Sequence, residues 1–266
     1  MSSTSARVSS GLGETSPRFE WPANFRFAER AIGRHTTIDG VTYKVAECRE
    51  ERERAFRMIH DAYTHAGLMP SNFAGMRVTP YHLLPTTAVF LAVKDDEILC
   101  TLSLIGDGEL GVPMESIYPN EIAALRDKGD YFGELSCLAD RRQQSVQVLT
   151  VLTNLNGLVR QYAQYHDMDH LLIAVHPKHE RVYRRFFGFR QFGCLKSYPS
   201  VGDRPAIAAI HDFARTEVER YPMYDQIHAT TYSTWELLAR PMSESERDYF
   251  RPVADLCGGY LPMAAA

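Results

Sequence analysis

A single glutamate inside a predicted strand is the first residue whose type and position suggest chemistry. The segment Tyr131–Ala139 (YFGELSCLA) is typical of a strand, and it places Glu134 where a carboxylate is costly unless it is paired or used. Burial raises the pKa of such a carboxyl group toward neutral pH, which suits a general base that removes a proton from an attacking amine. A structural ion pair at a sheet edge is the alternative interpretation.

Strand alternation predicts which neighbours act together with Glu134. Ser136 and Leu138 fall on the same face of the predicted strand as Glu134, and we expect both to line the substrate site. Cys137 then falls on the other face with Leu135, unless a β-bulge resets the alternation. We therefore expect Cys137 to be a small core residue, not an acyl-accepting nucleophile.

Polar residues also follow the next buried strand, Leu171–Val175. His176 lies near the carboxyl end of this strand, where open α/β sheets bind their ligands, and it could equally cap the helix that follows. The spacings His176-x-x-His179 and His166-x-x-x-His170 resemble metal-ligand pairs. No cysteine or third histidine supports either pair, so we expect no metal site.

Basic side chains cluster at the same predicted strand ends and on the helix after Pro177. They are Arg141, Arg142, Lys178, Arg181, Arg184 and Arg185. A solvated helix face is one interpretation of this cluster. A docking surface for a strongly acidic partner protein is the other.

The stretch Leu68–Pro85 contains three prolines and one glycine and is predicted to be an irregular loop. Long loops of this kind in compact domains are often functional. Arg77 and His82 lie within it, and an arginine fork suits a carboxylate. We therefore expect Arg77 and His82 to hold an acceptor substrate.

Length and composition limit the class of protein. The chain has 266 residues, of which 45% are hydrophobic, and its formal net charge of −4 gives no general field for binding DNA or an anionic membrane. The longest apolar stretch, Ala88–Val93, is far below the ~18 residues of a membrane-spanning helix, and Met1–Pro17 contains no secretory signal. The five cysteines include no CxxC pair, which is typical of free thiols in a cytoplasmic protein.

Hydrophobic periodicity predicts the elements that must position these residues. Besides the two strands already named, we expect a strand at Tyr43–Ala46, a helix over Arg49–Gly67, a hairpin of Thr87–Val93 and Ile98–Leu104, a short helix within Met114–Lys128, a long helix over Ser145–His166, a helix over Lys178–Phe187, and strands at Phe189–Phe192 and Arg204–His211. This order predicts an α/β (α+β) fold with a mixed sheet and helices on both faces.

The chain is expected to be organised around one large domain. Met1–Pro17 is predicted to be a disordered tail, residues 18–36 an arm that docks on the body, residues 37–212 the catalytic domain, and residues 213–266 a C-terminal helical extension.

Several stretches resemble a known family. The order strand, long helix, strand and helix, ending in Tyr183-Arg-Arg-Phe-Phe-Gly-Phe, is similar to the second half of the GCN5-related N-acetyltransferase fold. The stretches starting at His82 (HLLPTTAVF), Gly133 (GELSCLA), Ile173 (IAVHPKH) and Ser197 (SYPSVGD) resemble the bacterial N-acyl amino acid synthases, such as the long-chain N-acyl-tyrosine synthases. The resemblance covers residues 40–212, and the strand with Glu134 is also similar to that of acyl-homoserine-lactone synthases.

This resemblance implies a V-shaped split between two parallel strands and a defined reaction. The enzyme would move a medium or long fatty acyl chain from acyl carrier protein to the α-amine of an amino acid. The phosphopantetheine arm of acyl carrier protein would be the acyl-bearing co-substrate, and the basic cluster would dock the carrier protein. No cofactor would be tightly bound. Glu134 would be the base, and a backbone N–H near Leu138 would bind the oxyanion.

Tyr183 corresponds in the same fold to the aromatic residue that protonates the leaving thiol. It stands five residues before Gly188, whereas four is the usual spacing in the fold, so core packing is the alternative role for Tyr183.

The sequence is also compatible with two other functions. Acetyl-coenzyme A enzymes of this fold carry a glycine-rich pyrophosphate loop, whereas Asp140–Ser145 (DRRQQS) contains no glycine, which weakens coenzyme A as donor. An acetyl- or acyl-coenzyme A-dependent N-acetyltransferase acting on a small amine is the nearest alternative. A non-catalytic acyl- or carrier-protein-binding module is the alternative from another class.

Overall fold

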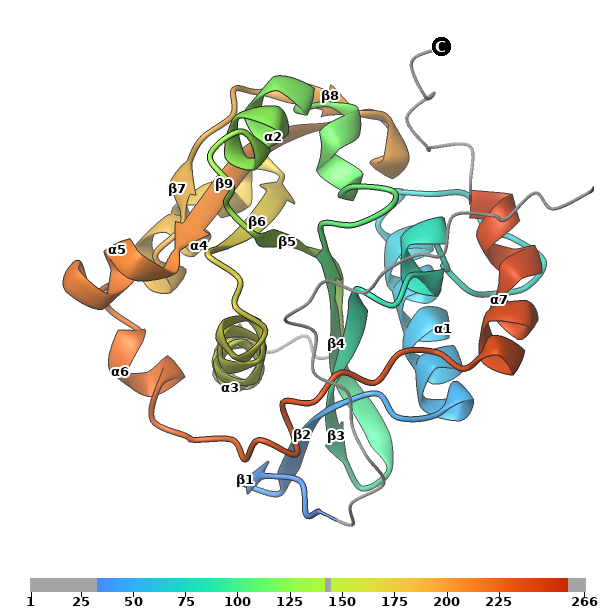
Figure 1. Cartoon of the computed structure of the whole chain (residues 1–266). Helices are drawn as coiled ribbons and strands as arrows, with labels where there is room; N and C mark the ends of the chain where they lie inside the picture. The colour runs from blue at the N-terminus through green and yellow to red at the C-terminus, as the bar shows by residue number, and fades with distance from the viewer. Residues whose placement is uncertain (1–32, 142–144, 258–266) are drawn as a thin grey trace, which may run out of the picture.

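The computed structural model of the protein describes residues 33–141 and 145–257 (Figure 1). Its strands are β1 (Thr37–Ile38), β2 (Val41–Val45), β3 (Thr87–Lys94), β4 (Glu97–Gly106), β5 (Phe132–Asp140), β6 (His170–Val175), β7 (Arg190–Gln191), β8 (Lys196–Tyr198) and β9 (Arg204–Asp212). Within the described ranges these strands form one mixed sheet of order β1-β2-β3-β4-β5-β6-β9-β7, with β8 paired to β9.

The helices connect the strands and cover the sheet. They are α1 (Arg49–His65), α2 (Pro119–Arg126), α3 (Ser145–Tyr165), α4 (Pro177–Phe187), α5 (Phe213–Val218), α6 (Tyr224–Ile227) and α7 (Glu244–Cys257), with short 3-10 turns η1 (Pro80–Leu83), η2 (Pro113–Ser116) and η3 (Pro199–Val201). None of the described helices is long and apolar enough to cross a membrane.

Helices lie on both faces of the sheet, as the sequence predicts (Figure 1). Phe90 of β3 points into the core under α3, where it meets Tyr162 edge to face at 5.2 Å. Its neighbours Val89 and Leu91 belong instead to the core under α1 and α7. Because successive residues of a strand point to opposite faces, α3 and α1 cover opposite sides of the sheet.

β5 and β6 are the one parallel pair among the described strands, and they pair only briefly. Phe132, Gly133 and Glu134 of β5 lie opposite residues 170–172 of β6. Beyond Glu134, β5 continues to Asp140 beside β4, whereas β6 continues to Val175 beside β9. The V-shaped split between two parallel strands is therefore confirmed, with Glu134 at its apex.

A β-bulge interrupts β5 just beyond this apex. The register of β4 on β5 shifts after the pair Ser103–Ser136, so that Leu102 alone lies opposite Cys137 and Leu138. Cys137 adopts a φ of 55°, in the left-handed region that few residues other than glycine occupy. The extra residue reverses the faces of the sheet to which the following side chains of β5 point.

The bulge changes which side chains share a face. Leu138 packs with Leu135 against the α3 core, whereas Cys137 joins the core under α1, on the side that Glu134 faces. The predicted alternation beyond Ser136 is therefore wrong. Cys137 is nevertheless a buried core residue, as expected, with 4% of its surface exposed.

The ends of the chain differ in how far the structure describes them. The expected tail, Met1–Pro17, and residues 18–32 of the expected arm lie outside the described residues. The remaining arm residues contact the C-terminal region, where the Thr36 N–H donates to Glu236 and His35 packs on Trp235 at 4.8 Å.

Candidate active site

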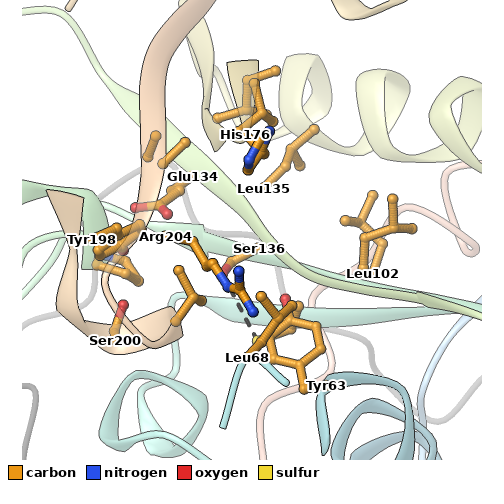
Figure 2. Close-up of a pocket in the computed structure, with 18 of the residues that line it drawn as sticks. Tyr63, Leu68, Leu102, Glu134, Leu135, Ser136, His176, Tyr198, Ser200 and Arg204 are labelled. Carbon is orange, nitrogen blue, oxygen red and sulfur yellow. Dashed lines mark hydrogen bonds between the residues drawn. The ribbon is translucent and has the colours of Figure 1, made fainter. Parts of the chain in front are cut away.

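A cavity of about 480 Å³ occupies the split between β5 and β6 (Figure 2). On the α3 side its lining is mainly apolar and includes Leu102, Leu135, Leu138, Leu152, Ile173 and Val175, with Asn156 of α3 and Lys178 of α4 as polar members. On the α1 side its lining is aromatic and polar and includes Tyr63, Arg77, Tyr81, Glu134, Tyr198 and Arg204. The two halves therefore suit an apolar chain and a polar second substrate.

Glu134 lies where the two halves meet. Only 2% of its surface is exposed, and its Oε2 accepts a hydrogen bond from the backbone N–H of Met114 at 2.6 Å. Burial raises the pKa of its carboxyl group to about 8, although the Met114 hydrogen bond acts in the opposite direction. No cation among the described residues forms an ion pair with Glu134, so an ion pair within this part of the chain does not account for the buried carboxyl group.

Two tyrosines that the sequence analysis did not select flank this carboxyl group. Tyr198 lies beside Glu134 in Figure 2, and Tyr81 reaches the same cavity from η1. Burial, followed by the neighbouring Glu134 charge, raises the pKa of Tyr81 to about 12. The Tyr81 hydroxyl is buried and has no hydrogen-bond partner among the described residues, so it can donate to a substrate or a water molecule.

Tyr183 enters the cavity from α4. Its ring packs on Phe187 and Phe189 with centroid distances of 5.9 Å in both cases. Burial raises the pKa of its hydroxyl to about 12, so the side chain is a neutral proton donor near pH 7. The structure therefore gives Tyr183 a packing role and a place in the cavity lining.

The other predicted residues of β5 and β6 also line the cavity: Ser136, Leu138 and His176. The Ser136 hydroxyl lies 3.8 Å from the Cys137 sulfur. His176 caps α4, because its Nδ1 accepts a hydrogen bond from the Lys178 backbone N–H at 3.2 Å. Capping and cavity lining are thus compatible for His176.

The two residues predicted to hold the acceptor are separated. Arg77 is buried at the cavity, stacks over the Tyr63 ring at 4.8 Å and donates to the Ser200 carbonyl at 3.3 Å. His82 is 1% exposed and is not part of the lining.

Hydrogen bonds hold His82 inside the fold. Its Nδ1 accepts from the Thr79 N–H at 2.9 Å, and its Nε2 lies 3.1 Å from the Ser103 hydroxyl. Burial lowers the pKa of His82 to about 3, so it stays neutral and fixes η1 to β4. The geometry gives no support to His82 as an acceptor ligand.

The predicted basic cluster is found mainly on α4. Lys178, Arg181, Arg184 and Arg185 are all exposed there. The acidic residue of this helix, Glu180, pairs with Arg184 at 2.9 Å. Arg141 is exposed at the end of β5, 4.0 Å from Glu97, and Arg142 lies outside the described residues.

The histidines of the two predicted pairs make other contacts in the structure. No three His, Cys, Asp or Glu residues within the described ranges are arranged to hold a metal ion. The rings of His176 and His179 are 6.4 Å apart. His166 bonds to a backbone carbonyl at 2.9 Å, and His170 pairs with Asp130 at 3.2 Å.

A split sheet with a buried carboxyl group between an apolar and a polar half-cavity suits an enzyme that joins an apolar chain to a polar substrate. The family model of the N-acyl amino acid synthase FeeM matches residues 54–212. The chain therefore belongs to this family of N-acyl amino acid synthases, and the resemblance drawn from the sequence is confirmed. It is accordingly an acyltransferase.

Solved structures agree with this assignment. The structure of FeeM, an N-acyl amino acid synthase from uncultured soil microbes, is 26% identical with a TM-score of 0.59 and covers 69% of this chain and 95% of its own. The coenzyme A-dependent acyl-homoserine lactone synthase MesI shares the fold at 15% identity, with a TM-score of 0.52 and coverage of 72% and 97%. A search of curated proteins found no match.

Proposed function

We propose that this enzyme transfers a medium or long fatty acyl chain from acyl carrier protein to the α-amine of an amino acid. The observation that carries the proposal is Glu134, a buried carboxyl group at the meeting point of two half-cavities that has no cationic partner among the described residues. Family membership supports an acyl amino acid as product. The four described cysteines, Cys48, Cys100, Cys137 and Cys194, are free thiols, which favours a reducing compartment such as the cytoplasm.

The acyl chain fits the apolar half of the cavity. A hydrocarbon chain needs a lining without hydrogen-bonding groups. The aliphatic side chains of this half provide one, among them Leu135, Leu138, Leu152 and Ile173. The thioester then lies in the split, beside the bulge at Cys137. The bulge leaves an extra residue outside the regular ladder, and its backbone N–H is the candidate donor to the oxyanion.

The acceptor fits the polar half of the cavity. Glu134 removes one proton from the ammonium group, and the nitrogen lone pair then attacks the thioester carbonyl carbon. The C–N bond forms, the C–S bond breaks, and the sulfur takes a proton from Tyr183. The nitrogen loses its second proton as the amide forms, and this proton restores Tyr183, while Glu134 returns its proton to solvent.

Coenzyme A is the second candidate donor, because the related structures MesI and BjaI are described as coenzyme A-dependent synthases. The segment Asp140–Ser145 lacks the glycines that let a backbone approach a pyrophosphate. The exposed cations of α4 suit an acidic protein. Both observations favour the carrier protein.

One experiment tests the proposed function directly. The enzyme is mixed with acyl carrier protein loaded with a twelve-carbon chain and with each common amino acid, and free thiol and N-acyl product are measured together. We expect amide and thiol in equal amounts, and faster turnover than with the same chain on coenzyme A. Thiol release without amide, or no reaction, would overturn the proposal, and a preference for coenzyme A would replace the donor.

A further inference from the structure

We propose that Arg204 selects acceptors that carry an α-carboxylate, by binding this group while Glu134 receives the amine. The inference rests on the proposed function and adds the residue that distinguishes an amino acid from a simple amine. Arg204 begins β9 and lines the polar half of the cavity, near Tyr198 and Ser200 (Figure 2).

Arg204 is a cation whose charge is not used inside the described fold. Its side chain is exposed, and no described residue forms an ion pair or a hydrogen bond with it. Its guanidinium group lies close to Gly67, just after the end of α1. If Gly67 carried a Cβ atom, that atom would lie 3.6 Å from Nη2 of Arg204. The group is therefore free to turn toward a ligand in the cavity mouth.

Arg77 is less suited to this role because its contacts already fix it. It is 6% exposed, stacks on Tyr63, lies 3.5 Å from the Met69 sulfur and donates to the backbone of Ser200. Ser200 belongs to the turn between β8 and β9. Arg77 thus holds the hairpin that carries Arg204, and we assign it a positioning role.

The charges around the cavity explain why a carboxylate is needed. The described lining contains the cations Arg77, Lys178 and Arg204, and its acidic residue is Glu134, which is largely protonated at pH 7 because burial raises its pKa. An ammonium group alone meets a positive environment there. A substrate that also carries a carboxylate can offset this repulsion through a bidentate hydrogen-bonded ion pair with the guanidinium group.

A donor phosphate is a poorer ligand for Arg204. The exposed cations of α4, which suit the carrier protein, lie beyond β6, and α4 packs on the α3 side of the sheet through Phe187. Arg204 instead reaches toward α1, on the opposite side. The two groups of cations therefore address different substrates.

The test compares an amino acid with the amine formed by removing its carboxyl group, using one acyl carrier donor. We expect the wild-type enzyme to prefer the amino acid. Arg204→Gln should raise the KM for the amino acid by about 10- to 100-fold, which is the usual effect of losing a charged hydrogen-bond pair, with kcat changed only a few-fold. The kcat/KM for the amine should not fall in the variant and should rise modestly, because one repelling positive charge is removed. The KM for the donor should stay the same.

Two further variants serve as controls. Arg204→Lys should restore part of the preference because it keeps the charge but not the fork. Arg220→Gln removes an exposed arginine outside the cavity, paired with Asp225 at 3.2 Å, and should change nothing. Equal losses with both acceptors, a raised donor KM, or an unchanged Arg204→Gln enzyme would overturn the inference. A wild-type enzyme that acylates no amino acid would instead overturn the proposed function.

Discussion

At the scale of single residues, Glu134 links the stability of the fold to its chemistry. Burial raises its pKa from an ordinary value of 4.5 to about 8. Between these two pH values the unfolded chain is ionised at this position whereas the folded chain is protonated. The contribution of Glu134 to folded stability is therefore fully present below pH 4.5 and is lost as the pH rises toward 8, by about 1.4 kcal/mol per pH unit.

The first prediction follows from this linkage. Glu134→Gln keeps a polar group that can accept the Met114 hydrogen bond but cannot ionise. We expect its melting temperature to exceed that of the wild type at pH 8 to about 9, and to approach the wild-type value near pH 4.5. Thermal unfolding across this pH range measures the difference. A constant difference at all pH values would mean that the pKa of Glu134 is the same in the folded and the unfolded chain.

The second prediction concerns the same variant in catalysis. The kcat/KM of the wild type should rise with pH through an apparent pKa near 8, because only the ionised carboxylate can accept a proton. Glu134→Gln should lose this limb and about 10²- to 10⁴-fold of the rate. Initial rates from pH 6 to about 9.5 decide the matter. Full activity in a folded Glu134→Gln enzyme would remove this residue from the mechanism.

At the scale of elements, the sequence predicts regular segments well and the bulge poorly. Hydrophobic periodicity locates α3 and β6 within one residue at each end, because burial imposes a strong pattern on them. No glycine or asparagine marks Cys137 as a left-handed position, so the sequence allows a bulge there but gives no signal for one. A local backbone conformation that is maintained by tertiary packing leaves no hydrophobic periodicity in the sequence.

The third prediction tests the bulge at Cys137. Cys137→Ala should keep activity within a few-fold, because amine attack on a thioester needs no enzyme nucleophile. Cys137→Val should lower the free energy of unfolding by about 1–3 kcal/mol, since a β-branched side chain is strained at positive φ. Urea denaturation and acyl transfer rates measure the two effects. A folded but inactive Cys137→Ala enzyme would restore the nucleophile hypothesis.

The candidate site was predictable in part, and the limit has a physical cause. Glu134 and Ser136 lie on β5 and His176 directly follows β6, so the order of the two strands that form the split brings them together. Tyr81 and Arg204 come from η1 and from the start of β9, segments more than a hundred residues apart in the chain. Only the tertiary structure places them at one cavity, and local sequence carries no signal for it.

At the scale of the whole molecule, the charge is unevenly distributed. The chain has a formal net charge of −4, yet α4 presents four exposed cations beside the split. A local patch of this sign accelerates and orients docking of an acidic protein even when the total charge is unfavourable. The molecule therefore presents a locally positive surface to an acidic partner on this side.

The fourth prediction tests this docking surface. The double variant Arg181→Glu and Arg185→Glu should raise the KM for acyl carrier protein by about tenfold or more at low salt, and less at high salt, because added ions screen exposed charges. The KM for a small acyl-pantetheine thioester should stay the same. Arg220→Glu, which reverses an exposed charge outside the cavity, is the matched control. Equal effects on both donors would place the defect in the cavity.

The brief contact between β5 and β6 has a consequence for how this enzyme can evolve. Main-chain amides and carbonyls on the inner edges of the split need a partner, and the amide bonds of a pantetheine arm can serve as one. Such recognition is independent of side-chain identity. Substitutions of side chains around the split can then change which amine or which length of hydrocarbon chain is bound, while the thioester-bearing arm binds as before. New products are therefore accessible without a change of fold.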